Sequence, residues 1–351
     1  DKGGLVIDST PCNNPEAPYD LVKTMRASFY VLGPLLSRFG YAKVSMPGGC
    51  AWGPRPVNFH VDAMEKIGAE TELMDGYIVA KGEKLSGGRL EFEVSSVGAT
   101  GNAVMAAVGA VGDTIISNAA TEPEITCLCD FLNSMGARIL GVGTSELRIK
   151  GGSVMNGADV DVIPDRIEAA TFLIAGAMSG ESVTVDSVIP EHLSSVLDML
   201  RLTGNKFDIS NTHITISKQE RPKPVSIETG IYPGFPTDVQ AQWMALMSIA
   251  DGQSTITDTV YHDRFTHIAE LNRLGADIKL RQNVAKIKGS DNLKGAPVMS
   301  TDIRASASLI IAALAAEGRT DISRVYHIDR GYEEIEKKFQ SLGADIKREK
   351  E

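Results

Sequence analysis

A glycine recurs at the end of five similar segments, and this recurrence limits the fold more than any other feature. The glycines are Gly68, Gly136, Gly204, Gly275 and Gly343, and the spacings between them are 68, 68, 71 and 68 residues. Each one follows a helical pattern and precedes a run typical of a strand, as in LNSMGARIL and FQSLGADIK. A fixed period of this kind marks repeated supersecondary units. We predict that each glycine takes the left-handed conformation that ends a helix and releases the chain into a strand.

Every unit also contains an earlier helix that is rich in alanine and serine. Examples are RIEAATFLIAGAMSG and TDIRASASLIIAALAAEG, which are apolar on nearly all sides. Such helices should be buried on most faces, and their small residues permit close helix packing. Short β-rich runs such as SVTVDSV and STITDTV follow them. The pattern predicts an α/β protein in which three units surround buried parallel helices, with the sheets outside.

The same period indicates how the chain divides into lobes. One period back from Gly68, near position 0, the chain opens with DKGGLVIDST, which is similar to the strand that follows such a cap. This predicts six units in two lobes of three, with roughly 65 residues of the first unit lying upstream. A passage rich in glycine and aspartate at 151–161 precedes IPDRIE and is the candidate crossover. We expect an incomplete first lobe over residues 1–162 and a second over residues 163–351.

Composition excludes several classes of partner and site. The formal net charge of −10 argues against nonspecific binding to nucleic acid or to a membrane surface. The four cysteines lack metal-type spacing, and Cys127 and Cys129, two residues apart on a helix, should point to different faces. Their number fits a reducing cytoplasm. No apolar run is long enough for a membrane span, and no sequence feature predicts a metal or a cofactor.

Arginine recurs at one position of the repeat. In three units the turn before the second helix carries it, 11 to 13 residues before the glycine: Arg55 in GPRPV, Arg264 in HDRFTH and Arg330 in IDRGYEE. The other two units have Glu124 and His192 near this position. Arginine at a helix start is not favoured by the helix dipole, so its recurrence indicates that the side chains face a negative group. Phosphate or carboxylate would suit such a site, and ordinary surface ion pairs are the alternative.

The starts of the first helices carry further charged residues. Arg26 in MRAS is echoed by Arg304 in IRAS, and two carboxylates open helices, Asp238 in GFPTDVQAQ and Asp302 in STDIRAS. Helix capping explains either aspartate, and the functional alternative makes one of them a base or an acceptor for a hydroxyl. The loop SSVGATGN at 95–102 could present backbone N–H groups to a phosphate, although it lacks an established glycine-rich spacing.

Six stretches, in order from about residue 17 to the C-terminus, can be taken together. They are APYDLVKTMRAS, PGGCAWGPRPV, SVGAT, FPTDVQAQ, TDIRASASL and VYHIDRGYEEIE. They closely resemble the UDP-N-acetylglucosamine 1-carboxyvinyltransferases, the enolpyruvyl transferases that catalyse the first committed step of peptidoglycan synthesis. The resemblance implies two domains, each an inside-out α/β barrel (an α/β prism) of three repeats. It also implies phosphoenolpyruvate and UDP-N-acetylglucosamine as substrates, no cofactor, and no nucleic-acid or membrane partner.

Cys50 lies in the loop PGGCAWGPRP, among three glycines and three prolines. By the resemblance it is the general acid that protonates C3 of phosphoenolpyruvate, and it is the residue alkylated by fosfomycin. A thiol with an ordinary pKa of about 8.5 is mostly protonated at neutral pH, as an acid must be. Nearby arginines would favour the thiolate. We expect the loop to act as a lid, with the glycines as its hinge.

The resemblance assigns the remaining site residues. Asp238 would accept the proton of the sugar hydroxyl, Asp302 would be a second active-site aspartate, and Arg330 would bind phosphoenolpyruvate. The expected substrate-binding residues are Arg26, Arg55, Pro56, Val57, Asn58, Phe59, Ser95, Ser96, Val97, Gly98, Val260 and Arg304.

The sequence departs from the family pattern at three places. The family's lysine–asparagine pair belongs to a segment that this sequence does not contain, and the lysine contacts phosphoenolpyruvate. Val94 stands where a lysine is common, and Asn58 stands where an aspartate is common. Two other functions therefore stay open: an enolpyruvyl transferase acting on shikimate 3-phosphate, and a non-catalytic protein that binds the UDP-sugar.

Overall fold

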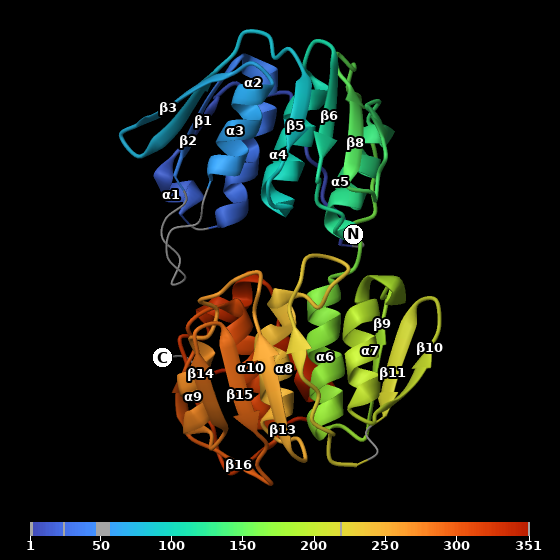
Figure 1. Ribbon diagram of the computed structural model, residues 1–351, viewed down its shortest axis with the longest axis vertical. Coiled ribbons are helices and arrows are strands. Elements are labelled where there is room, and N and C mark those ends of the chain that lie inside the picture. Colours follow the sequence, from blue (N-terminus) through green and yellow to red (C-terminus); the bar gives the residue numbers. More distant parts are fainter. Residues whose placement is uncertain (1–2, 24, 47–56, 218–219, 350–351) are drawn as a thin grey trace. The chain divides into compact units, whose positions relative to one another are not determined.

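The computed structural model describes residues 3–23, 25–46, 57–217 and 220–349. Contacts along the chain divide it into two compact units, Asp1–Val162 and Ile163–Glu351. Both are drawn in Figure 1, and each is described here by itself.

Unit 1 contains two repeats of helix and sheet. Its helices are α1 (Tyr19–Val22), the 3-10 helix η1 (Arg26–Val31), α2 (Leu32–Phe39), α3 (Asn58–Lys66), α4 (Val97–Val108) and α5 (Pro123–Ser134). Its strands are β1 (Glu16–Ala17), β2 (Tyr41–Ser45), β3 (Glu70–Met74), β4 (Tyr77–Lys81), β5 (Gly88–Glu91), β6 (Asp113–Ser117), β7 (Arg138–Leu140) and β8 (Glu146–Lys150).

Unit 2 contains three repeats. Its helices are α6 (Arg166–Ser179), η2 (Pro190–Leu193), α7 (Ser194–Leu202), η3 (Thr237–Val239), α8 (Gln240–Met247), α9 (His267–Arg273), α10 (Ile303–Leu314), η4 (Val325–Arg330) and α11 (Ile335–Ser341). Its strands are β9 (Ser182–Asp186), β10 (Lys206–Ile209), β11 (His213–Ser217), β12 (Ile227–Glu228), β13 (Gln253–Thr257), β14 (Asp277–Arg281), β15 (Val284–Lys288), β16 (Leu293–Lys294), β17 (Pro297–Met299), β18 (Ala316–Glu317) and β19 (Asp321–Ser323).

The same sheet topology recurs in the two units. Three sheets have the orders β1-β2-β4-β3, β5-β6-β8-β7 and β12-β13-β15-β14. In each, the first pair is parallel and the other pairs are antiparallel. A fourth sheet, β10-β11-β9, repeats the antiparallel part, and the last repeat contributes the parallel pairs β16-β18 and β17-β19. Repeated α/β units, predicted from the glycine period, are confirmed.

The predicted helix-ending glycines are also confirmed. Gly68, Gly136, Gly204, Gly275 and Gly343 have φ values of 99, 111, 98, 91 and 93°, all in the left-handed region that favours glycine. The prediction of a strand after the fifth is wrong, because residues 344–349 have no regular structure. In the other four units the run after the glycine pairs with the next strand along the chain. Among the described residues, no strand pairs with the run after Gly343.

An asparagine three residues before the glycine clamps the helix end to the strand in two repeats. Asn133 accepts a hydrogen bond of 2.8 Å from the Ile139 N–H and donates one of 3.1 Å to the Ile139 carbonyl. Asn272 makes the same pair of bonds with Ile278, at 3.1 Å each. One side chain thereby satisfies both backbone groups of a strand residue, which stabilises the turn that the glycine allows.

The core of unit 2 is built from α6, α8 and α10, which pack against one another and lie side by side in Figure 1. Every residue of α8 is buried, as are most residues of α6 and α10. Alanines such as Ala170, Ala245 and Ala312 are fully buried where these helices meet. Larger side chains there would overpack the contact, at a cost of about 1–3 kcal/mol each. The expected buried helices with sheets outside are therefore present in unit 2.

In unit 1 the helices α2 and α4 approach so closely that only glycine fits at Gly33. A Cβ atom there would lie 2.3 Å from the carbonyl oxygen of Asn102. The Gly33 N–H instead donates a 2.6 Å hydrogen bond to Asn102 Oδ1. The Nδ2 of the same asparagine donates to the Phe29 carbonyl and lies 3.0 Å from His60 Nδ1. One buried amide therefore joins η1, α2 and α3 to α4.

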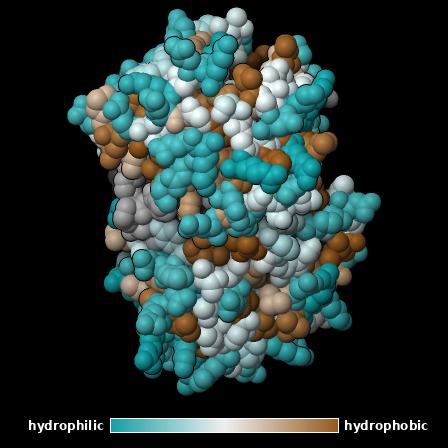
Figure 2. Space-filling view, turned by 45° about the horizontal axis from the view of Figure 1, so that its top comes forward, coloured by the Kyte–Doolittle hydropathy of each residue, from teal (hydrophilic) through white to brown (hydrophobic). Residues whose placement is uncertain are grey.

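The face of the molecule shown in Figure 2 is mainly hydrophilic. On the face shown in Figure 2, hydrophobic residues form separate patches among hydrophilic ones. Scattered exposed hydrophobic side chains of this kind are normal for folded proteins. Over the described part of the chain, no helix combines the length and the apolar character needed to span a bilayer.

Candidate active site

An aspartate stands at the start of each of the three core helices of unit 2. Two of these aspartates cap their helices: Asp165 Oδ1 and Asp302 Oδ1 each accept hydrogen bonds of 2.8 and 3.1 Å from the backbone N–H groups two and three residues later. Capping, one of the two explanations open for Asp302, is therefore confirmed. Asp302 is 8% exposed, so little of it faces solvent.

Asp238 is the aspartate that does not cap. It lies within η3, whose first turn is preceded by Pro236 and has no side-chain cap. Its carboxylate instead forms two ion pairs, 2.5 Å from Oδ1 to Arg264 Nη1 and 3.5 Å from Oδ2 to Arg304 Nη2. The side chain of Asp238 is 40% exposed, whereas those of the two arginines are 13% and 16% exposed. An accessible carboxylate thus rests on two largely buried guanidinium groups.

The charges at this cluster affect one another strongly. Burial opposes ionisation of Asp238, but the guanidinium groups of Arg264 and Arg304 outweigh it and hold the pKa of the carboxyl well below its usual range. Burial likewise opposes the charge on Arg304, and Asp238 outweighs that effect and raises the arginine pKa. The cluster is therefore ionised at neutral pH, with two positive charges and one negative charge among these three residues.

Asp258, which is fully buried, holds the segments that carry this cluster. Its carboxylate accepts hydrogen bonds of 2.7 Å from the hydroxyls of Thr229 and Thr237, and bonds of 3.0 and 2.8 Å from the N–H groups of Val260 and Tyr261. Thr237 directly precedes Asp238 in η3, and its hydroxyl also accepts a 3.3 Å bond from Arg264 Nη1. One buried carboxylate therefore fixes both the aspartate segment and the loop with Val260, whose side chain is 43% exposed.

Polar side chains also lie beneath the cluster. Thr171 on α6, Gln242 on α8 and Tyr332, two residues after η4, are joined by hydrogen bonds of 2.8 to 3.4 Å. Arg304 Nη1 donates a 3.3 Å bond to the Tyr332 hydroxyl. All three repeats of unit 2 thus contribute to the surroundings of Asp238.

In unit 1 the loop at 95–98 forms the start of α4. Ser96 caps the helix by accepting a 3.3 Å hydrogen bond from the Ala99 N–H, and the carbonyl of Val97 accepts one from the Tyr30 hydroxyl. A Cβ atom at Gly98 would lie 2.9 Å from His60 Nε2, so the histidine leaves room only for glycine. Ser95 is partly exposed beside this helix start.

The start of α3 holds three further expected binding residues. Val57 is 8% exposed and belongs to the core. Asn58 and Phe59 line a small pocket of about 110 Å³. The other lining residues are Asp62, Ala63, Lys66, Leu90, Glu91, Phe92 and Glu93. Val57 is thus placed to support the helix, whereas Asn58 and Phe59 reach a surface cavity.

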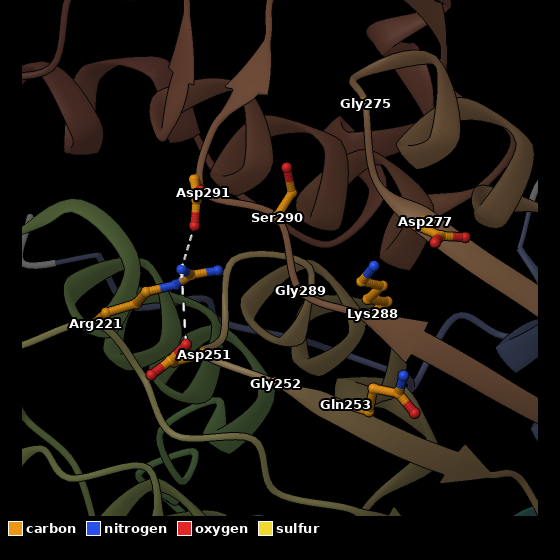
Figure 3. Close-up of a pocket in the computed structure, with 10 residues that line it drawn as sticks. All are labelled: Arg221, Asp251, Gly252, Gln253, Gly275, Asp277, Lys288, Gly289, Ser290 and Asp291. Atoms are coloured by element: carbon orange, nitrogen blue, oxygen red, sulfur yellow. Dashed lines mark hydrogen bonds and ion pairs between the residues drawn. The ribbon is translucent and has the colours of Figure 1, made fainter.

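A larger polar pocket, of about 650 Å³, lies elsewhere in unit 2. Figure 3 shows Arg221 between Asp251 and Asp291, with Lys288 and Asp277 on the opposite side. Arg221 also donates hydrogen bonds of 2.9 Å to the carbonyls of residues 249 and 250, which follow α8. The pocket therefore lies at the C-terminal end of α8, whereas Asp238 lies just before its N-terminal end, and the helix between them is about 12 Å long. Arg221 binds the backbone carbonyls that follow the end of this helix.

Comparison with known proteins gives the family. The family described as EPSP synthase (3-phosphoshikimate 1-carboxyvinyltransferase) matches residues 1–339. The UDP-N-acetylglucosamine 1-carboxyvinyltransferase of Chlorobaculum parvum is 56% identical over 347 residues, which are 98% of this chain and 82% of that protein. The enzyme of the same name from Geobacter metallireducens is 52% identical over 350 residues, with 99% and 84% covered. The chain belongs to the UDP-N-acetylglucosamine 1-carboxyvinyltransferase family.

Solved structures agree with this family. The enolpyruvyl transferase NikO from Streptomyces tendae superposes with a TM-score of 0.86 at 27% identity, over 97% of this chain and 81% of that one. EPSP synthase from Acinetobacter baumannii superposes with a TM-score of 0.70 at 19% identity, over 93% and 79%, which shows a shared fold. The α/β fold of repeated units predicted from the sequence is that of the enolpyruvyl transferases.

Some family positions lie outside the described residues. Cys50, Arg55 and Pro56 belong to the segment 47–56, and the side chain of Arg26, the first residue of η1, is likewise outside them. Arg330 ends η4 and is exposed. Over the described residues, no three His, Cys, Asp or Glu side chains are grouped so as to hold a metal ion.

Sequence reasoning missed several residues of the site. Arg264 was singled out only as a member of the arginine repeat, and Asp258, Thr171, Gln242 and Tyr332 were not identified. A usable signal exists for two of them, because Thr171 and Gln242 are polar residues within mainly apolar runs. A buried polar residue needs a partner, so such positions point to a network.

Proposed function

We propose that this chain transfers the enolpyruvyl group of phosphoenolpyruvate to the 3-hydroxyl of UDP-N-acetylglucosamine and releases phosphate, the first committed step of peptidoglycan synthesis. The supporting observation is Asp238, an accessible carboxylate held by two mostly buried arginines where the core helices of unit 2 begin. Its family membership agrees with this chemistry. The proposed location is the cytoplasm, and no cofactor, nucleic acid or membrane takes part.

The chemistry proceeds by addition and then elimination. The sugar oxygen bonds to C2 of phosphoenolpyruvate while C3 gains a proton. The bond from C2 to the phosphate oxygen then breaks as C3 loses a proton, which leaves the enolpyruvyl ether. The reaction needs a base at the hydroxyl, an acid at C3, and cations around the phosphate and the carboxylate.

Asp238 is proposed as the acceptor of the hydroxyl proton. While both arginines pair with it, the carboxylate is a weak base, because its pKa is held low. An anionic substrate that attracts Arg264 or Arg304 would weaken these pairs and raise the basicity of Asp238. Binding of phosphoenolpyruvate would therefore activate the base at the moment when the base is required.

The cations and the acid complete the assignment. Arg304, together with Arg330, Arg55 and Arg26, is proposed to bind the phosphate and the carboxylate. Cys50, which lies outside the described residues, is proposed as the acid at C3. Three parts of the chain are proposed to contact the nucleotide sugar. They are the segment Arg55, Pro56, Val57, Asn58 and Phe59, the start of α4 with Ser95, Ser96, Val97 and Gly98, and Val260. Asp302 supports the site through the start of α10.

The direct test is phosphate release. We expect the chain with phosphoenolpyruvate to release phosphate on addition of UDP-N-acetylglucosamine and not on addition of shikimate 3-phosphate. Release with shikimate 3-phosphate alone would assign the other transferase activity. Sugar-nucleotide binding without release would favour the binding protein if it persisted in a chain extended upstream by roughly 65 residues, one repeat period.

Fosfomycin labelling tests Cys50. Mass spectrometry should find one adduct, and Cys50→Ser should abolish it while sugar-nucleotide binding persists. Cys129 is a matched negative control, because burial raises its pKa to about 12 and it is fully buried. Labelling of Cys127 or Cys129 instead of Cys50 would contradict the assignment.

A further inference from the structure

Three buried polar side chains, one from each repeat of unit 2, lie under the Asp238–Arg304 ion pair. Thr171 and Gln242 are completely buried, and Tyr332 is 1% exposed. They surround one another: the Tyr332 hydroxyl lies 2.8 Å from Thr171 Oγ1, and Gln242 Nε2 lies 3.1 Å from Thr171 Oγ1 and 3.4 Å from the Tyr332 hydroxyl. Gln242 Nε2 also donates a 3.1 Å bond to the main-chain carbonyl of Asp238. The three side chains come from helices and a segment that pack in the mainly apolar core of unit 2.

The protons in this network have one consistent direction. Thr171 donates its single hydroxyl proton to the Ile167 carbonyl, 2.9 Å away. Thr171 must therefore accept at its contact with Tyr332, so the phenol donates there. Arginine can only donate, so the Tyr332 oxygen accepts from Arg304 Nη1 at 3.3 Å. Burial raises the pKa of Tyr332, so the phenol keeps its proton.

The position of Arg304 shows what this acceptor does. A guanidinium beside a carboxylate favours a two-bonded, fork-like pair. Here only Nη2 faces Asp238, at 3.5 Å, while Nη1 faces the Tyr332 hydroxyl. Arg264 already pairs with Asp238 Oδ1, and the Tyr332 hydroxyl holds Nη1 of Arg304, so Arg304 reaches the carboxylate through Nη2.

We propose that the Tyr332 hydroxyl is a positioning residue, which holds Arg304 in a partial pair with Asp238 and so keeps both groups available to the substrates. This inference rests on the proposed function. Without the hydroxyl, Arg304 would close on Asp238 as a full pair. The arginine would then bind phosphoenolpyruvate less well, and the aspartate would be a weaker base.

The test is Tyr332→Phe, which removes one oxygen and keeps the packing. We expect the KM for phosphoenolpyruvate to rise and kcat to fall, so that kcat/KM for phosphoenolpyruvate drops tenfold or more. The KM for UDP-N-acetylglucosamine should change less than twofold, because the variant leaves the nucleotide-sugar residues intact. The acidic limb of the kcat profile should also move to lower pH, which a merely structural role would not produce.

Matched variants separate positioning from stability. Ser248→Ala removes another fully buried hydroxyl at the opposite end of α8, where Ser248 donates 2.9 Å to the Met244 carbonyl, and it should leave the kinetics unchanged. Thr171→Val should reproduce part of the Tyr332→Phe defect, and Thr171→Ser should restore activity. The Tyr332→Phe/Thr171→Val double variant should lose little more than the worse single variant, since the residues act in one chain of hydrogen bonds.

The outcomes distinguish this inference from the proposed function. If the wild-type chain is active and a folded Tyr332→Phe variant is equally active, the positioning role of Tyr332 is overturned and the proposed function stands. If neither this chain nor the chain extended upstream turns over, the proposed function fails, and calorimetry with phosphoenolpyruvate becomes the measurement. Weaker binding by Tyr332→Phe than by Ser248→Ala would then support the role for Tyr332, and equal binding would overturn it.

Discussion

Thr237 and Asp258 are joined by a 2.7 Å hydrogen bond from the threonine hydroxyl to a fully buried carboxylate. Because Thr237 directly precedes Asp238, the bond fixes the backbone that presents the accessible carboxylate of the site. The position of the Asp238 carboxylate therefore depends on Asp258, whose own carboxylate is buried away from solvent.

Asp258→Ala should destabilise unit 2 by about 2–4 kcal/mol, because four donors lose their acceptor in a buried place. Asp258→Asn should cost less, since one oxygen remains to accept from the backbone. Urea unfolding measures both, and Asp277→Ala, which removes an exposed carboxylate at the start of β14, is the control. An Asp258→Ala chain as stable as this control would contradict the role of Asp258.

Asp238→Asn should lower kcat by roughly 10²–10⁴, the usual range for a positioned acid or base. It should also change the pH dependence of stability. The folded pKa of Asp238 lies below the ordinary 3.8, so its ionised pairs stabilise the fold above that pH and are lost as the pH falls through the lower folded value. The wild-type advantage should be present at pH 7 and shrink below about pH 4.

The control for that experiment is Asp198→Asn, which breaks an exposed pair with Arg201 in the same unit. Exposed pairs contribute little, so its unfolding midpoint should barely move. Equal effects of the two substitutions at pH 7 would show that the Asp238 cluster is no more than a surface ion pair.

His267 should make unit 2 sensitive to acid. It is 1% exposed, no hydrogen-bond partner among the described residues reaches its Nε2, and burial together with nearby Arg264 lowers its pKa to about 3. Between pH 6.5 and 3 the unfolded chain binds a proton that the folded chain does not, so stability falls as the pH falls. The loss from pH 7 to pH 5 should be about 2 kcal/mol.

Urea unfolding at both pH values, in wild type and His267→Gln, measures this contribution. The pH-dependent loss should be smaller by that amount in the variant, whatever its stability at pH 7. His262→Gln, at an exposed histidine, should keep the wild-type dependence. A His267→Gln chain that loses as much stability as wild type would exclude the buried imidazole as the cause.

Asn102→Ala should destabilise unit 1 by about 3 kcal/mol or more, because three buried groups on different helices lose their partner at once. Asn133→Ala removes an asparagine of the same size that clamps one local turn, and it should cost about 1 kcal/mol. Thermal unfolding of the two variants gives the comparison. Similar midpoints would mean that the helix contacts of unit 1 do not depend on Asn102.

Local signals in the sequence predicted much of the fold. Two signals can be read from short stretches of sequence: a glycine that takes the left-handed conformation, and an apolar helix before it. The repeat could therefore be recognised without tertiary information. The missing fifth strand shows the limit of this approach. The run after Gly343 has the sequence of a strand, but a strand also requires a partner for its backbone.

The site was predictable only in part, for a similar reason. Asp238 and Asp302 both follow threonine at a helix start, and nothing local tells the cap from the ion-paired carboxylate. The difference comes from Arg264, which the fold brings to Asp238 from 26 positions further along the chain. Tyr332 lies 161 positions from its partner Thr171, so only the folded chain reveals their contact.

The three aspartates at the core helix starts show how a repeated scaffold can acquire a single reactive centre. A repeated unit places a similar helix start at several positions in the fold. At two of these positions the aspartate, Asp165 or Asp302, has a structural role, because it caps its helix. The proposed chemistry lies at the helix start that differs from the other two, where Asp238 pairs with two guanidinium groups and does not cap the helix. Other proteins built from repeated segments can be searched in the same way, for the repeat in which a residue does not make the structural contact that its equivalents make.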